Sequence, residues 1–170
     1  SNEEPTASNV IISPSNAKST DNLALTYDYA DPDGDPQSGT IIEWHKNGSR
    51  DLSLSGMTVS NTLTLKHEVW FARVIPSDGT AFGAPIDSNS ITILNGAPTV
   101  SSASITPNIP TADQVLSISH VADEPDGDVT SVTDVRWFVD GSKIDSLDGE
   151  EQVPIIATRA GDVWNAQIMI

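Results

Sequence analysis

Apolar and polar residues alternate with a period of two along most of the chain, and no stretch keeps helical spacing over several turns. Leu23, Leu25, Tyr27 and Tyr29 alternate with polar or small residues, which predicts a strand with one buried face. Further strands are predicted around Ile42 and Trp44 and in the ranges 57–65, 69–76, 89–94, 135–139 and 164–170. The pattern therefore predicts an all-β protein.

The same succession of motifs occurs twice, 93 residues apart. Residues 31–35 read Asp-Pro-Asp-Gly-Asp, and residues 124–128 read Glu-Pro-Asp-Gly-Asp. Trp44 then corresponds to Trp137, and the dipeptide Asn47-Gly48 corresponds to Asp140-Gly141. Both dipeptides tolerate the positive φ that tight hairpins require. A period of this length suits a small sandwich with a core of its own rather than a stacked solenoid unit.

We therefore predict two tandem immunoglobulin-like β-sandwich domains, over residues 1–95 and 96–170. Roughly seven short strands with turns between them, and a tryptophan on the third strand, are typical of that sandwich. Residues 164–170 align with residues 70–76, so the second domain is predicted to lack its closing strand. Trp44 and Trp137 are expected in the cores, because a lone aromatic on a buried face is usually a packing residue.

Charge narrows the possible partners. The chain has 24 acidic and 8 basic residues and a net charge of −16, so its surface repels nucleic acid and anionic lipid and attracts cations. No apolar run is long enough to cross a bilayer, so membrane insertion is not expected. The chain has no cysteine, and a domain of this size can bury a core without disulfides.

Motifs in the ranges 44–48, 68–70, 76–79 and 88–98 resemble those of immunoglobulin-like repeats, related to cadherin-like and PKD-like modules, of bacterial and archaeal surface proteins. The resemblance implies an extracellular or cell-surface spacer or adhesive array, which calcium frequently stiffens. The chain departs from that pattern because its second copy has no counterpart of residues 76–94.

Both acidic loops are candidate calcium sites. Calcium needs six to eight hard oxygen ligands, and alternate carboxylates in a tight turn can aim several at one point. The candidate metal ligands are Asp31, Asp33, Asp35, Asp78, Glu124, Asp126 and Asp128. Alternatively, aspartate, proline and glycine are simply what exposed turns contain.

The sandwich topology predicts what surrounds each loop. The first loop is expected to face Asp78, Asp87 and the leading segment with Glu3 and Glu4. The second loop is expected to face residues 95–98, where a cation would pin one domain to the next.

Catalytic constellations are missing from the sequence. His45, His67 and His120 have no partners at ligand spacing, and the carboxylates are bunched in turns rather than placed across a cleft. We therefore expect no enzyme activity. Phe71 and Phe138 are predicted to point outward and could stack on sugar.

The expected function is a non-catalytic structural module of a surface or filament protein that provides spacing, stiffening and assembly. The alternative is an adhesin or a carbohydrate-binding module of a secreted protein. Expected partners are neighbouring repeats or protomers, joined by strand complementation at the edge of residues 164–170. Asn47 begins an Asn-Gly-Ser sequon and is a candidate glycosylation site, although the hairpin turn alone explains it.

Overall fold

The strands gather into two compact units. A computed structural model describes all 170 residues, and they divide into unit 1, Ser1–Gly96, and unit 2, Ala97–Ile170. The strand pairs within each sheet are antiparallel, and the helical elements are three short 3-10 turns. The predicted all-β fold class is confirmed, whereas its immunoglobulin-like topology stays a prediction.

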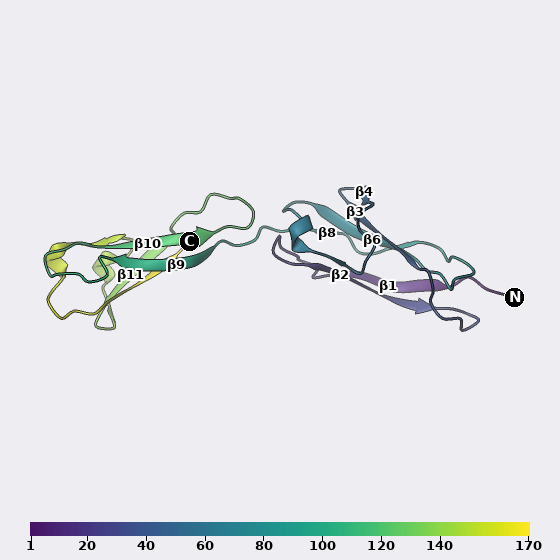
Figure 1. Ribbon diagram of the computed structural model, residues 1–170, viewed down its shortest axis with the longest axis horizontal. Helices are drawn as coiled ribbons and strands as arrows, with labels where there is room; N and C mark the ends of the chain where they lie inside the picture. The colour runs from purple at the N-terminus through teal and green to yellow at the C-terminus, as the bar shows by residue number, and fades with distance from the viewer. The chain divides into compact units, whose positions relative to one another are not determined.

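Unit 1 is built from two sheets around one core. One sheet has the order β1-β2-β5 and the other β4-β3-β6-β7, with β8 also paired to β6. Figure 1 shows β1 and β2 on one side of the unit and β3, β4 and β6 on the other. The strands are β1 Thr6–Ser13, β2 Leu23–Ala30, β3 Ile41–Lys46, β4 Ser49–Asp51, β5 Thr58–Val59, β6 Val69–Ile75, β7 Ile86–Asp87 and β8 Ile91–Thr92. Leu23 and Leu25 from one sheet share a buried cluster with Trp44 and Trp70 from the other. The alternation of apolar side chains produces this sandwich-type packing.

Unit 2 repeats the arrangement with fewer strands. Its sheets have the orders β13-β10-β9 and β12-β11-β14. The strands are β9 Thr99–Thr106, β10 Leu116–Asp123, β11 Asp134–Val139, β12 Ser142–Lys143, β13 Gln152–Val153 and β14 Trp164–Met169. Leu116, Val135, Trp137, Leu147 and Val153 form its buried core. Strand β14 lies at the edge of its sheet, whereas the equivalent β6 of unit 1 is flanked by β7 and β8.

The tryptophans pack alike in the two units. Trp44 meets Trp70 edge to face at a centroid distance of 6.4 Å, and Trp137 meets Trp164 in the same way at 6.2 Å. The indole N–H of Trp44 donates to the Gly56 carbonyl at 2.8 Å. Trp44 and Trp137 are completely buried, which confirms that they are packing residues.

Each of the two predicted tight turns makes the same kind of side-chain hydrogen bond. Asn47 Oδ1 accepts the N–H of Val69 at 2.9 Å, and Asp140 Oδ1 accepts the N–H of Val163 at 3.0 Å. Asn47 and Asp140 have φ values of 51° and 49°, a conformation that Asn and Asp tolerate better than most residues. Each side chain therefore ties its hairpin to the next strand of the same sheet. Glycosylation of Asn47 stays a prediction.

The strand predicted over 57–65 is wrong beyond Val59. The chain turns into a 3-10 helix, Asn61–Leu63, where Ser60 accepts the N–H of Thr62. The turn is attached to the residue before β2, because the N–H of Asn61 donates to Asn22 Oδ1 at 2.8 Å. Leu63 is consequently exposed.

The predicted strand over 89–94 is also shorter than expected. Only Ile91–Thr92 forms a strand, and an additional strand, β7, precedes it at Ile86–Asp87. Asn89 interrupts regular pairing, because its side chain accepts the N–H of Ile12 at 2.8 Å and donates to the Ile12 carbonyl at 3.2 Å. The segment contacts both sheets, because β8 pairs with β6 and the Asn89 side chain bonds to Ile12 of β1.

Candidate metal site in the acidic loops

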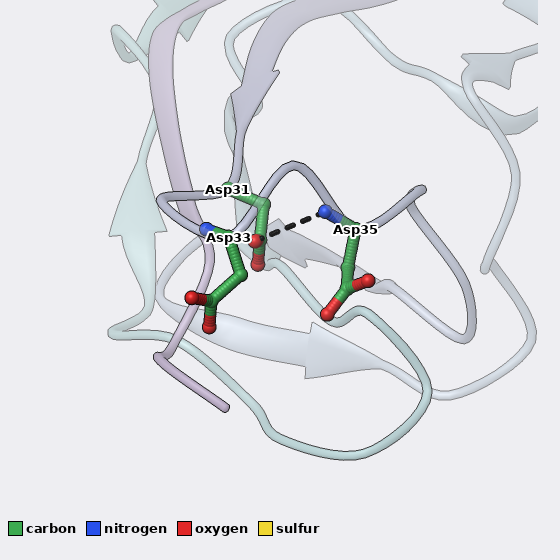
Figure 2. Close-up of side chains that lie close together, drawn as sticks. All are labelled: Asp31, Asp33 and Asp35. Carbon is green, nitrogen blue, oxygen red and sulfur yellow. Dashed lines mark hydrogen bonds between the residues drawn. The ribbon is translucent and has the colours of Figure 1, made fainter. Parts of the chain in front are cut away.

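The first acidic loop follows β2 and is shaped by its first aspartate. Asp31 Oδ1 accepts the backbone N–H groups of Asp33 at 2.8 Å and Asp35 at 3.2 Å. Gly34 completes the turn with a φ of 82°, which a glycine adopts without steric cost. As a result, all three carboxylates point to the same side of the loop (Figure 2).

This geometry brings together oxygen atoms that could bind a metal ion. One carboxylate oxygen each from Asp31, Asp33 and Asp35 lies within 4.8 Å of the others. Asp33 and Asp35 are exposed, while Asp31 is partly buried. Such a cluster can bind a metal ion, since an ion with oxygen ligands at about 2.3 to 2.6 Å would bridge oxygens at these separations. The described residues therefore include a candidate metal site in unit 1.

The other oxygen of Asp31 has an unusual environment. Asp31 Oδ2 is buried and has no hydrogen-bond partner in the protein. A buried carboxylate oxygen without a partner is costly, because it loses its hydration without gaining a protein contact. The Asp31 carboxylate therefore keeps one oxygen that no protein group contacts by a hydrogen bond.

The second loop repeats this construction with a longer acid. Glu124 Oε2 accepts the N–H groups of Asp126 at 3.0 Å and Asp128 at 2.5 Å, while Glu124 Oε1 is buried without a partner. Gly127 has a φ of 73°, matching Gly34. The acids of this loop do not gather as closely as those of the first. The backbone bonding recurs, but the compact donor cluster belongs to unit 1.

The leading segment of unit 1 contacts the first loop, as the sequence predicted in part. The backbone N–H of Glu3 donates to Asp33 Oδ2 at 2.7 Å, and Asn2 Nδ2 donates to Asp78 Oδ2 at 2.9 Å. Pro5 is buried, and its carbonyl lies so close to Gly83 that a Cβ there would be 1.8 Å from it. Three successive contacts thus hold the segment against the acidic end of unit 1.

Asp78 stands apart from the three clustered aspartates. Its Oδ1 accepts the N–H groups of Thr80 and Ala81 at 2.5 and 2.7 Å, which closes its own turn. The N–H of Ala81, followed by Asn2 and the N–H of Thr80, lowers the pKa of the Asp78 carboxyl. Asp78 therefore contributes negative charge at the acidic end of unit 1, and its carboxylate oxygens already accept hydrogen bonds from protein groups.

Asp87 was expected to face the loop, and in the structure its carboxylate pairs with Arg73. Arg73 Nε donates to Asp87 Oδ1 at 2.6 Å and Arg73 Nη2 to Asp87 Oδ2 at 3.0 Å. The two residues are cross-strand partners on β6 and β7, so the pairing of the strands brings them together. This bidentate pair lowers the pKa of Asp87, with the Arg73 hydrogen bond as the main cause.

Tyr29 belongs to the acidic end, although the sequence indicated only its place in a strand. Burial raises the pKa of its hydroxyl, and the negative charges of Asp31, Asp78 and Asp35 raise it further. The hydroxyl also donates to the Asp35 carbonyl at 3.4 Å. Its position two residues before Asp31 on an alternating strand was the available signal.

The two predicted sugar-stacking residues are partly buried on outer sheet surfaces. One ring face of Phe71 is covered by the imidazole of His45, at a centroid distance of 4.4 Å and an interplanar angle of 11°. Phe138 occupies the repeat position of His45 on β11, so unit 2 does not reproduce the stack. Glycan binding stays a prediction, and stacking on Phe71 would be limited to its other face.

No protein-family model matches the chain, and no curated protein matches it either. None of its helical segments is long and apolar enough to span a membrane. Arguments about function therefore rest on the geometry of the loops and sheets.

Proposed function

We propose that this chain is a non-catalytic structural segment of an extracellular surface or filament protein, and that the first acidic loop binds calcium. The observation that carries the proposal is the buried, unpartnered oxygen of Asp31 beside a cluster of carboxylates. The same bonding of the first acid, with one oxygen left unpartnered, recurs at Glu124. A loop built in this way twice favours a role beyond that of an ordinary turn.

Calcium is favoured among cations by the chemistry of the donors. The gathered ligands are carboxylate oxygens, which suit hard cations rather than metals that prefer nitrogen or sulfur. Exposed sites of this kind in extracellular modules bind calcium with Kd values of about 10⁻⁴ to 10⁻³ M. The resemblance to surface-protein repeats supports the same ion.

The proposed stiffening role is based on the contacts of the leading segment with the acidic end of unit 1. Glu3 donates to Asp33, a member of the candidate site, and Asn2 donates to Asp78 nearby. Without a cation, clustered negative charges repel one another and weaken the loop to which the segment is attached. A bound cation would neutralise them and fix the direction in which the chain enters unit 1. Each unit has its own core, as a spacer module requires.

Calcium is expected to raise the unfolding midpoint of unit 1 by roughly 5–10 °C. At a calcium concentration ten times a Kd of about 1 mM, ligand linkage contributes about 1.4 kcal/mol. The unfolding midpoint of a domain of this size rises by roughly 4–8 °C for each kcal/mol added to its free energy of unfolding. Differential scanning calorimetry of the whole chain, with and without calcium, measures the shift.

The variant Asp33→Asn/Asp35→Asn should lose most of this increase, because neutral ligands hold the ion weakly. The matched control is Glu150→Gln/Glu151→Gln, which removes two charges from unit 2 and should leave the calcium response of unit 1 intact. An equal rise with sodium chloride of the same ionic strength would mean that screening explains the effect, and the proposal would fail.

A further inference from the structure

The dipeptide Asn-Gly occurs twice in the chain, at residues 47–48 and 95–96. An asparagine before glycine can lose its side-chain amide spontaneously, because glycine has no Cβ to hinder the approach of its backbone nitrogen to the asparagine Cγ. Both asparagines are exposed, so access to water does not distinguish them. The difference between them lies in their backbone geometry and in the contacts of their side chains.

Asn47 is held in a conformation that resists this reaction. It begins the two-residue turn between the paired residues Lys46 and Ser49, and its φ is 51°. Its N–H donates to the Val69 carbonyl at 2.8 Å, and its Oδ1 accepts the Val69 N–H at 2.9 Å. Closure of a ring onto the Gly48 nitrogen requires rotation of the Asn47 side chain and of its ψ. That rotation would break the side-chain bond and disturb the hairpin.

Asn95 lies outside regular secondary structure. Residues 95–98 form no strand or helix, and Asn95 does not have a positive φ. The residue before it, Leu94, is anchored to unit 1, because its N–H donates to the Ala17 carbonyl at 2.7 Å and its carbonyl accepts the Ser19 N–H at 2.9 Å. Rotation about the Asn95 ψ can therefore proceed without breaking the backbone pairing of a strand.

The side-chain amide of Asn95 is also bonded in a way that favours attack. Lys66 Nζ donates to Asn95 Oδ1 at 3.3 Å, and Asn95 Nδ2 donates to the Gly96 carbonyl at 2.7 Å. The second bond keeps the amide beside the glycine whose nitrogen is the nucleophile. The first bond places a positive charge at the oxygen that becomes negative when the nitrogen attacks Cγ. Asn47 Oδ1, by contrast, bonds to a neutral N–H group.

We propose that Asn95 is a site of spontaneous deamidation and that the Lys66 ammonium accelerates the reaction. The Gly96 nitrogen loses its proton to water and forms a bond to Asn95 Cγ. The Cγ–Nδ2 bond then breaks, and Nδ2 takes up a proton and leaves as ammonia. Water adds to either carbonyl of the resulting succinimide and cleaves one of its two C–N bonds. The product is aspartate or isoaspartate at position 95, with one additional negative charge.

The modification would act on the connection between the two units. Isoaspartate lengthens the main chain by one methylene just after Leu94. The last member of the unit 1 core, Ile93, precedes this point, so the core of unit 1 is expected to stay intact. This inference does not depend on calcium or on the proposed function.

The test is incubation of the whole chain in mildly alkaline buffer, followed by peptide mapping with mass spectrometry, which quantifies each asparagine separately. We expect Asn95 to be converted at least about tenfold faster than Asn47, because Asn47 must first give up the hydrogen bonds of its turn. In guanidinium, which removes the fold, the two Asn-Gly sequences should react at similar rates.

Two variants examine the chemistry of the site. Lys66→Met keeps the apolar stem but lacks the ammonium. It should slow the conversion of Asn95 by roughly threefold, the scale of a solvent-exposed charge contact, and leave that of Asn47 unchanged. Asn95→Gln keeps an amide but disfavours ring closure, so it should abolish the more acidic species that isoelectric focusing detects in the wild type.

Three results would overturn the proposal. The first is conversion of Asn47 in the folded chain at a rate equal to or above that of Asn95. The second is the same ratio of the two rates in guanidinium as in the folded chain, which would make the difference a property of the neighbouring sequence. The third is an unchanged rate at Asn95 in Lys66→Met, which would remove the role assigned to Lys66.

Discussion

Replacing Trp44 by alanine is expected to lower the free energy of unfolding of unit 1 by about 3–5 kcal/mol, the usual cost of removing a large buried aromatic. Trp44 is completely buried, packs edge to face on Trp70 and donates to the Gly56 carbonyl. The substitution leaves a cavity and removes the partner of that carbonyl. Since small domains have only about 5–15 kcal/mol of stability, unit 1 would lose a large fraction of it.

Guanidinium unfolding followed by circular dichroism measures this loss. Leu52→Ala is the control, because Leu52 is 83% exposed and its removal should change stability by no more than about 0.5 kcal/mol. Trp137→Ala should have a comparable effect in unit 2, whose tryptophan has an equivalent environment. A loss below about 1 kcal/mol for Trp44→Ala would contradict the buried packing role.

Substitution of Gly83 by alanine is expected to destabilise unit 1 by about 1–3 kcal/mol through overpacking. A Cβ at this position would lie 1.8 Å from the Pro5 carbonyl oxygen, so the backbone must move. The leading segment would be displaced, and the Glu3 bond to Asp33 would weaken with it. Chemical unfolding gives the stability change, and amide hydrogen exchange at Glu3 reports the displacement.

Gly56→Ala is a matched control for the same chemical change. A Cβ at Gly56 meets no atom within 4 Å, and this glycine does not have a positive φ. Its replacement should leave Glu3 protection unchanged. Equal protection of Glu3 in Gly83→Ala and in the wild type would show that the contact with Pro5 does not position the segment.

The sheet architecture was predictable because alternation reports burial directly. Leu23 and Leu25 face the core as their spacing indicates, and the equivalent Leu116 does the same in unit 2. The tight turn at Asn47 was predictable because few residues accept a positive φ. Such features depend on a residue and its near neighbours, so the sequence alone contains the signal.

Features set by distant contacts were not predictable. Leu63 and Leu65 continue an apolar alternation, yet the chain leaves the sheet after Val59 in a 3-10 turn whose Asn61 bonds to the distant Asn22. Apolar spacing indicates burial only where a partner surface exists. In the same way, Asn89 is polar but organises the closing segment through a bond to Ile12, which lies 77 positions away.

The features of the candidate site also fall into those set by local sequence and those set by distant contacts. The spacing of Asp31, Asp33 and Asp35 indicated their convergence, because a local turn produces it. The position of Tyr29 two residues before Asp31 was a local signal, whereas the pairing of Asp87 with Arg73 could not be read from local sequence, because it depends on strand register. The buried oxygen of Asp31 likewise follows from the surrounding tertiary structure.

The most direct test of the calcium proposal is a crystal structure of the whole chain grown with calcium, with anomalous scattering used to locate the ion. We expect an anomalous peak within about 2.3 to 2.6 Å of oxygens from Asp31, Asp33 and Asp35, with Asp31 Oδ2 among the ligands. An ordered loop with no peak at millimolar calcium, or a peak that remains in Asp33→Asn/Asp35→Asn at equal occupancy, would contradict the proposal.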